Sequence, residues 1–391
     1  MKYKLAYTSL IFLIYILGKN IPLYGIDLDA YKEELLGAET VLTQIVNGDT
    51  YQSSVFALGI FPFMISSLVV QIAMAVRKLF VKTGISPKTM GRISVMVTLA
   101  VAILQAFDRI EKLQFDTAGQ ALGMTKLLAG VEMVAGAMLI LWLSGRNGRY
   151  GIGGRMAFGL VNILERILSI LEKHNLQNLV LPLIIAFVMM VATVIMENAE
   201  MRIPVQRVSI HNIYADKNYM AVKLNPVGVM PMMFTSAVFM LPRLVLSLLV
   251  YLFPWNGGVI WLVTNMTLSE PFGIAVYVVC EYLLTIGLAM LMISPTDITE
   301  QFLKSGDSIV NLHAGQDTRR YLRKTVGIIS FFSATVMGAF VALPLILQME
   351  GKVDGTLAVL PVSVMMMTSF WCNIFRELVS IHKYDSCQPL F

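Results

Sequence analysis

Ionisable side chains inside apolar segments are the first candidates for chemistry in this sequence. Glu132 and Glu281 each stand within a long apolar run, and the pair Glu165-Arg166 interrupts another. Carboxylates within a membrane commonly bind ions or relay protons, which would indicate a solute transporter. Because no basic partner is evident for Glu132 or Glu281, a glutamate satisfied by Ser or Thr of neighbouring helices is the other interpretation.

Residue patterns typical of enzymes and metal sites do not occur. The three cysteines, Cys280, Cys372 and Cys387, are too scattered for a disulfide framework or a metal cluster, and the four histidines fall in polar stretches. The sequence contains no His-Glu-x-x-His, Gly-x-Ser-x-Gly or nucleotide-binding loop. We therefore expect no catalytic residue, no metal, no cofactor and no direct binding of nucleic acid. An intramembrane enzyme is the least favoured function.

The composition indicates that lipid is the solvent for much of the chain. Of the 391 residues, 57% are apolar and 14% are charged, whereas soluble domains average about 45–50% and about 25%. Apolar runs long enough to span a bilayer predict an all-α polytopic membrane protein of about ten transmembrane helices. The predicted spans lie near 5–18, 59–76, 93–107, 127–143, 156–171, 179–196, 226–250, 272–293, 325–347 and 356–379.

The distribution of Lys and Arg decides the doubtful fifth span, 156–171. With ten spans and a cytoplasmic N-terminus, most of the 30 Lys and Arg residues lie on the cytoplasmic side. Without the fifth span, the split between the two sides becomes nearly even. The positive-inside rule therefore favours ten spans, with both termini in the cytoplasm. The two long cytoplasmic loops are then 197–223 and 294–324.

A nine-residue motif occurs twice. Residues 59–67 read Gly-Ile-Phe-Pro-Phe-Met-Ile-Ser-Ser, and residues 228–236 read Gly-Val-Met-Pro-Met-Met-Phe-Thr-Ser. The copies stand near the starts of the second and seventh predicted spans, which run in opposite directions. Interrupted helices at matching places are typical of inverted repeats, whose functional site lies between the two halves. Coincidence is the alternative, because Gly and Pro are common in membrane helices.

The repeated motif places bulky apolar side chains beside the Gly-Pro break. Ile60 and Met64 of the first copy correspond to Val229 and Met233 of the second. Such side chains could form a hydrophobic constriction that blocks ions by dewetting and yields to a large passenger. Ordinary helix packing is the alternative, and periodicity does not exclude it.

These motifs resemble the SecY family, whose members form the central subunit of protein-translocation channels. Residues 54–62 (Ser-Val-Phe-Ala-Leu-Gly-Ile-Phe-Pro) are similar to the signature of the family's second helix. Further matching stretches follow in the family's order along nearly the whole chain, which makes the set more specific than any one motif. They are 21–27 (Ile-Pro-Leu-Tyr-Gly-Ile-Asp), 151–154 (Gly-Ile-Gly-Gly), 202–206 (Arg-Ile-Pro-Val-Gln), 223–231 (Lys-Leu-Asn-Pro-Val-Gly-Val-Met-Pro) and 314–318 (Ala-Gly-Gln-Asp-Thr).

The resemblance implies an hourglass pore between two inverted five-helix halves, 1–175 and 176–391. An external segment at about 37–51 would plug the pore, and a lateral gate between the second and seventh helices would open to lipid. Ser67 and Gln105 are candidate polar residues of this gate, with helix packing as the alternative role. Carried over by motif, the apolar pore ring would consist of Ile60, Met64, Leu160, Met233 and Leu360.

The resemblance also implies the partners. Because the chain has no nucleotide-binding loop, a SecA-type motor ATPase would drive an unfolded secretory polypeptide through it. Small SecE- or SecG-like or accessory Sec membrane subunits would bind the chain within the lipid bilayer. Motor docking is expected at residues of the long cytoplasmic loops, whose basic side chains are also positive-inside topology signals. The docking residues are Arg202, Arg207, Lys217, His313, Arg319, Arg320, Arg323 and Lys324.

Several departures from the housekeeping pattern resemble the accessory SecY of Gram-positive bacteria. The chain lacks the amphipathic segment before the first helix and has a short C-terminal tail, and His313-Ala314 replaces the usual Arg-Pro. The loop 197–223 is also thinner in basic residues. This subfamily implies a bacterial plasma membrane and a restricted cargo, such as serine-rich glycoprotein adhesins. An inverted-repeat secondary transporter of a small solute, coupled to ions through Glu132 or Glu281, is the alternative function.

Overall fold

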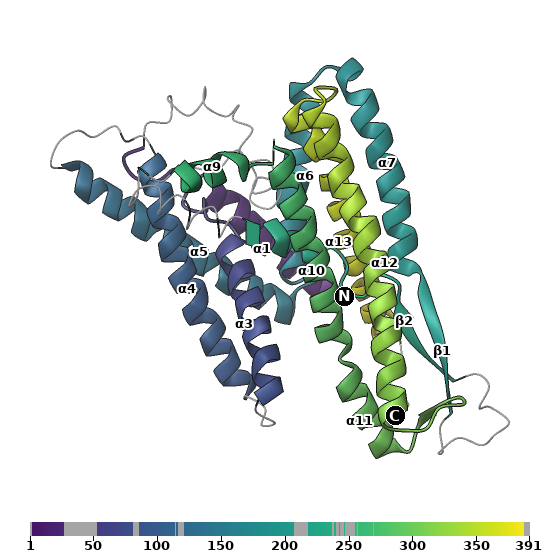
Figure 1. Ribbon diagram of the computed structural model, residues 1–391. Coiled ribbons are helices and arrows are strands. Elements are labelled where there is room, and N and C mark those ends of the chain that lie inside the picture. The colour runs from purple at the N-terminus through teal and green to yellow at the C-terminus, as the bar shows by residue number, and fades with distance from the viewer. Residues whose placement is uncertain are drawn as a thin grey trace.

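Long helices make up most of the computed structural model, and a small sheet lies at one end (Figure 1). The structure describes residues 2–26, 53–80, 86–113, 115, 121–206, 218–236, 238–239, 242, 246, 255, 257–268 and 270–386. Helices cover nine of the predicted spans: α1 (Lys2–Lys19), α3 (Phe61–Phe80), α4 (Pro87–Lys112), α5 (Ala121–Tyr150), α6 (Met156–Lys173), α7 (Leu176–Asn198), α10 (Pro271–Ile293), α12 (Gln316–Met349) and α13 (Gly355–Ser386). Two shorter helices are α9 (Gly257–Asn265) and α11 (Pro295–Ser305).

Two predicted segments are described in part or not at all. Of the seventh predicted span, 226–250, residues 230–236 are described and helical, as are 238–239, 242 and 246. The predicted plug, 37–51, lies outside the described residues.

Six helices of the described residues are long and apolar enough to cross a membrane, as expected of a multi-pass membrane protein. They are Lys88–Glu111, Leu122–Tyr150, Gln177–Asn198, Pro271–Ser305, Gln316–Met349 and Gly355–Tyr384.

The helix α6 differs from these six because charged side chains interrupt its apolar sequence. Glu165 and Arg166 stand in its middle, as the sequence indicated. Lys19 Nζ at the end of α1 lies 2.6 Å from Glu165 Oε2, and the Lys19 side chain is almost fully buried. Pairing with α1 therefore compensates the charge of Glu165, and the fifth predicted span is a helix despite its charges.

Proline and capping residues determine where several helices begin. Ser86 precedes α4, and its Oγ accepts a hydrogen bond from the Thr89 N–H at 3.4 Å, with Pro87 in the first helical position. The helices α10 and α11 are separated by Ser294, whose φ of 36° is left-handed, and by Pro295, which begins α11. A left-handed residue followed by proline breaks the helical hydrogen-bond ladder.

The expectation of an all-α chain is wrong in the loops 197–223 and 294–324. Strands β1 (Glu200–Gln206), β2 (Tyr219–Lys223) and β3 (Ser308–Ile309) form an antiparallel sheet in the order β2-β1-β3. Ile203, Val222 and Ile309 are buried in one apolar cluster. Side chains of a strand alternate between its two faces, so the alternating apolar residues of β1 bury one face of the hairpin.

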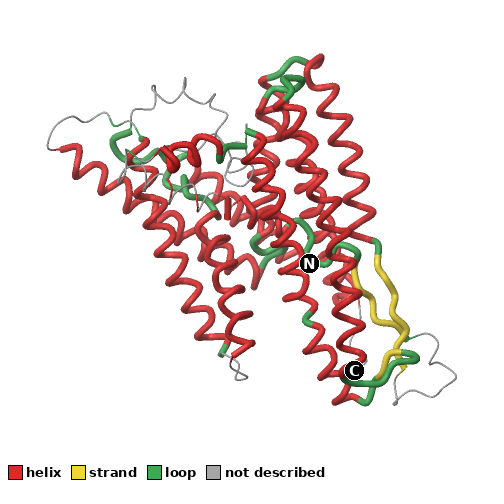
Figure 2. Tube along the Cα trace, in the orientation of Figure 1, coloured by secondary structure: helices red, strands yellow, loops and turns green. Residues whose placement is uncertain are grey.

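Neighbouring helices form two groups, whose lower parts lie apart in the tube view (Figure 2). In one group α3 packs on α4 and α4 on α5; in the other α10 packs on α12, α12 on α13 and α13 on α7. Figure 1 places the β1–β2 hairpin, α11 and the C-terminal end of α3 at one end of the molecule. The α6–α7 and α12–α13 connections lie at the opposite end.

Candidate functional site

Both copies of the repeated motif begin with a glycine in the left-handed region. The φ angle is 53° at Gly59 and 69° at Gly228, a conformation that is readily available only to glycine. A Cβ added at Gly228 would lie 3.2 Å from Glu197 Oε1. A larger residue at this position would therefore meet both backbone strain and a carboxylate.

The turns that follow these glycines also match. Ser67 Oγ donates to the Met64 carbonyl at 2.9 Å, and Ser236 Oγ donates to the Met233 carbonyl at 2.7 Å. The same hydroxyl-to-carbonyl bond therefore spans three residues at equivalent positions of the two copies. The sequence repeat is a repeat of local structure, which argues against coincidence.

The two copies meet in buried apolar clusters that share one methionine. Ile60 and Met64 are each 5% exposed and belong to a first cluster, whereas Val229 belongs to a second. Met233 packs against both clusters, and Leu160 of α6 packs against the second. Four of the five residues of the predicted ring thus lie in adjoining clusters.

The structure does not bring Leu360 together with the other four. Leu360 of α13 is 0% exposed and lies in a separate cluster with Ile170 and Leu179. Val362 and Met366 of the same helix belong to the second cluster instead. Two residues two positions apart are related by a rotation of about 200° around the helix axis, so they face nearly opposite directions. The motif comparison therefore selected a helix that reaches the second cluster, but Leu360 itself faces a different cluster.

The predicted gate residues occupy different surroundings. Leu68 of α3 and Leu288 of α10 both belong to the first cluster. Ser67 is half-buried on α3 next to Leu68. Gln105 of α4 is buried beside Ala106, whose cluster contains no residue beyond Ala137. Ser67 therefore lies next to a residue of the first cluster, which includes residues of both halves of the chain, whereas the cluster of Ala106, the residue after Gln105, contains among the described residues only residues of the first half.

The two intramembrane glutamates have unlike environments. Glu132 accepts a hydrogen bond from the Tyr24 N–H at 3.0 Å, which anchors the segment that follows α1. Glu281 is 0% exposed, and neither of its carboxylate oxygens has a hydrogen-bond partner among the described residues. Neither glutamate hydrogen-bonds to a second ionisable side chain among the described residues.

A basic surface covers the start of α12. Thr318 and Leu322 are buried on the opposite face of this helix, and the Thr318 hydroxyl donates to the His313 carbonyl at 2.9 Å, which fixes the exposed His313 beside the surface. Cations are unfavourable at a helix N-terminus, and the basic side chains of this surface form no ion pair among the described residues. The exposed residues of the basic surface are Arg319, Arg320, Arg323 and Lys324.

Arg202 lies on β1, apart from α12 in sequence. Its guanidinium is 3.0 Å from Glu200 Oε1 and stacks 4.7 Å from the centroid of the Tyr219 ring on β2. Its side chain is exposed and presented by a two-stranded hairpin. Arg207 and Lys217, the other predicted docking residues of this loop, lie outside the described residues.

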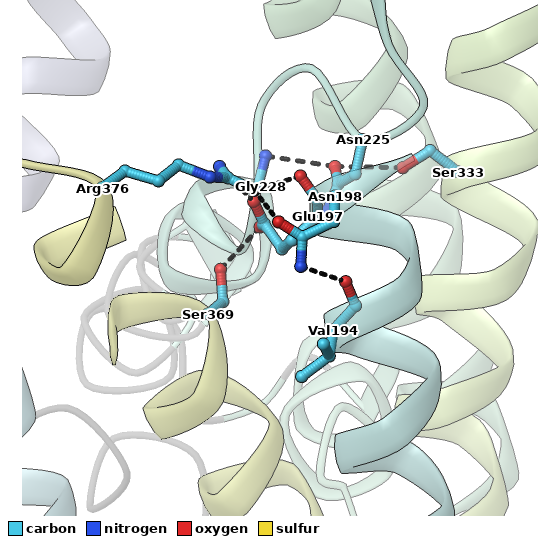
Figure 3. A network of polar contacts seen from close by, with 8 residues as sticks. All are labelled: Val194, Glu197, Asn198, Asn225, Gly228, Ser333, Ser369 and Arg376. Atoms are coloured by element: carbon cyan, nitrogen blue, oxygen red, sulfur yellow. Dashed lines mark hydrogen bonds and ion pairs between the residues drawn. The ribbon is translucent and has the colours of Figure 1, made fainter. Parts of the chain in front are cut away.

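Sequence reasoning did not single out a polar network beside Gly228 (Figure 3). The network contains Glu197 at the end of α7, Arg376 and Ser369 on α13, and Asn225 in the turn before Gly228. A signal existed, because Arg376 is a charged residue within the predicted span 356–379, where ionisable groups are unusual.

Comparison with known proteins identifies the family. Residues 54–369 match the family model for SecY. The chain belongs to the SecY family. The resemblance seen in the motifs is thereby confirmed.

Similar SecY proteins extend over nearly the whole chain. An accessory Sec system protein translocase subunit SecY2 of Leuconostoc gelidum subsp. gasicomitatum is 27% identical, over 99% of this chain and 96% of its own length. A protein of the same description from Streptococcus agalactiae serotype Ia is 29% identical, over 96% of this chain and 92% of its own.

Solved structures share the SecY fold. One described as "The structure of a protein conducting channel" superposes with a TM-score of 0.70 and 14% identity, covering 97% of this chain and 92% of its own. A canine Sec61 structure superposes with a TM-score of 0.62 at 15% identity, over 97% of this chain and 92% of its own.

Proposed function

We propose that this SecY family chain is the channel subunit of a protein translocase, through which secretory polypeptides cross a membrane. The meeting of the two Gly-Pro repeats in buried apolar clusters that share Met233 carries the proposal. An apolar constriction keeps ions out by dewetting and needs no specific contact with its passenger. Flexible methionines can adapt to varied polypeptides.

The proposed architecture has ten spans in two inverted halves, 1–175 and 176–391. Nine helices at the predicted positions and the helical residues 230–236 support this count. The pore would be closed by the apolar side chains of the two clusters, and the segment at about 37–51 would plug it. The first cluster contains residues of α3 and Phe234 of the seventh span, which supports a lateral gate between these two helices.

We place the channel in a bacterial plasma membrane with both termini in the cytoplasm. The excess of Lys and Arg on one side by the predicted topology supports this orientation. The common position of the β1–β2 hairpin, α11 and the end of α3 in Figure 1 agrees with it, because all three belong to predicted cytoplasmic segments.

The proposed energy source is a SecA-type motor ATPase that binds the cytoplasmic loops. The basic surface of α12 and Arg202 of β1 would contact acidic residues of the motor, and Arg207 and Lys217 would add to them. Complementary charge sets partner choice and association rate more than affinity. Small SecE- or SecG-like or accessory Sec membrane subunits are proposed as further partners.

An accessory role with a restricted cargo, such as serine-rich glycoprotein adhesins, is the narrower form of the proposal. It is supported by the names of the similar SecY2 proteins and by His313-Ala314 beside the basic surface. A motor selected for this surface would differ from the housekeeping motor.

Reconstitution tests the proposal against solute transport. The complete complex is placed in lipid vesicles, and ATP-dependent passage of an unfolded polypeptide is measured with and without the motor. Passage that requires motor and ATP is the expected result. Uptake of a small solute driven by an ion gradient, without polypeptide passage, would instead support the transporter and would implicate the buried Glu281.

A further inference from the structure

Buried polar side chains from α7 and α13 meet beside Gly228 (Figure 3). Glu197 is 2% exposed, although it carries a carboxylate. Its Oε1 accepts a hydrogen bond from Ser369 Oγ at 2.7 Å, and its Oε2 lies 3.3 Å from Arg376 Nη1. Arg376 Nη2 also donates to the Glu197 carbonyl and, at 3.1 Å, to Asn198 Oδ1. The end of α7 is thereby bonded to α13.

A second set of bonds holds the turn before the seventh span. Asn225 Oδ1 accepts from the Gly228 N–H at 3.1 Å and from Ser333 Oγ of α12 at 3.1 Å. Gly228 also lies against the Glu197 carboxylate, since an added Cβ would be 3.2 Å from Oε1. Both sets of bonds therefore converge on the left-handed glycine that begins the second repeat.

Other buried serines of the same helices behave differently. Ser363 of α13 donates to the Val359 carbonyl at 2.9 Å, and Ser330 of α12 donates to the Val326 carbonyl at 2.6 Å. A buried serine satisfies its hydroxyl in this way within its own helix. Ser369 and Ser333 instead donate to side chains of other elements, Glu197 and Asn225, which lie beside Gly228. Their hydroxyls therefore link elements, which a serine bonded within its own helix does not do.

We propose that these residues form a positioning cluster that holds the seventh span in its closed position and relays displacement of the β1–β2 hairpin to it. The cluster consists of Glu197, Asn225, Ser333, Ser369 and Arg376. The inference rests on the proposed channel function and adds a connection between motor and gate.

The connection is short in both directions. Arg376 donates hydrogen bonds to the backbone carbonyl of Glu197 and to the side chain of Asn198, and β1 begins at Glu200. A force on the hairpin, which presents Arg202, therefore reaches Arg376 over a few residues. At the other side, a displacement of Gly228 relative to Asn225 and Glu197 would break its N–H bond to Asn225 or its contact with the Glu197 carboxylate.

Two matched pairs of buried serines test the cluster. Ser369→Ala and Ser333→Ala each remove one cluster bond, whereas Ser363→Ala and Ser330→Ala remove a buried hydroxyl bonded within the same two helices. In cells that carry the complete translocase, export of a cargo with a defective signal sequence is measured at low and high levels of the motor.

The cluster variants should loosen the closed state, and the control variants should not. We expect export of the defective cargo to rise about tenfold for Ser369→Ala, whose bond is to a carboxylate, and about fivefold for Ser333→Ala. The controls should stay within about twofold of the unmodified channel. Dependence of export on motor level should fall only in the two cluster variants, and sedimentation of the motor with membranes should be unchanged in all four.

The outcomes separate the two proposals. If all four variants export the defective cargo equally, whether at the level of the unmodified channel or above it, the cluster is overturned and the channel function is left intact. Loss of motor binding in Ser369→Ala would also overturn it, because the cluster would then belong to the docking surface. An unmodified channel that exports no polypeptide would overturn both proposals.

Discussion

Replacing Ile60 by Asn tests whether the first apolar cluster is a seal. Ile60 is 5% exposed, so the closed channel would have to bury an amide among apolar side chains. Loss of isoleucine burial costs about 1.5–3 kcal/mol, and an unsatisfied buried amide costs about 1–3 kcal/mol. An open, wetted channel relieves the second cost and part of the first. We therefore expect a shift of about 3 kcal/mol toward the open state, which raises the ratio of open to closed channels roughly 100-fold.

Two measurements check this expectation. The resting conductance of planar bilayers that contain the purified complex should rise in Ile60→Asn, and cells should export cargo whose signal sequence is defective. Met233→Asn should behave in the same way, because Met233 packs against both clusters. Ile60→Leu is the control, since it keeps the volume and apolarity of the side chain, and it should conduct like the unmodified channel.

Loss of all transport in Ile60→Asn without any rise in conductance would refute the reasoning, because Ile60 would then be an ordinary packing residue. Leu360→Asn adds a second comparison. Since Leu360 lies in a cluster with Ile170 and Leu179, its replacement should lower the stability of the protein and leave the resting conductance unchanged. A leak from Leu360→Asn equal to that of Ile60→Asn would return Leu360 to the ring.

Three further predictions concern the motor surface and the topology. Arg319→Glu combined with Arg320→Glu should weaken motor binding about tenfold at low salt, and less at high salt, in sedimentation assays. Exposed ion pairs contribute only about 0–1 kcal/mol each and are screened by salt. Binding that does not depend on salt would contradict the docking surface. His313→Arg with Ala314→Pro should increase export driven by the housekeeping SecA, and efficient use of that motor by the unmodified channel would exclude the accessory role. Lys352→Cys, at an exposed position in the α12–α13 connection, should react with an impermeant thiol reagent only from outside the cell, and labelling only from the cytoplasm would overturn the topology.

The sequence alone determined the kind of environment and the positions of most helices. A segment that faces lipid must satisfy its backbone hydrogen bonds internally, so long apolar runs predict helices whatever their partners are. The repeat could also be recognised in the sequence, because the left-handed backbone at positions 59 and 228 favours glycine at both. Two of the motifs that identified the family, 54–62 and 223–231, contain these glycines, and the family model matches residues 54–369.

The sheet could have been predicted from the same sequence and was not. In β1, Ile203 and Val205 alternate with Arg202 and Gln206, a pattern typical of a half-buried strand. The surrounding membrane spans favoured an assignment of the whole segment as a loop. The alternation is short, and Pro204 within it argues against a central strand. The structure shows that β1 is the middle strand, with its apolar residues against Val222 and Ile309.

Only the tertiary structure decided which side chains meet across helices. It showed that Lys19 pairs with Glu165, that Val362 rather than Leu360 belongs to the second cluster, and that Arg376 forms an ion pair with Glu197. Such contacts depend on how each helix is rotated about its own axis. A helix that is apolar all round has no polar face to indicate this rotation, because lipid and protein interior are equally apolar. Packing in three dimensions sets the rotation, and with it which of the predicted residues form one site.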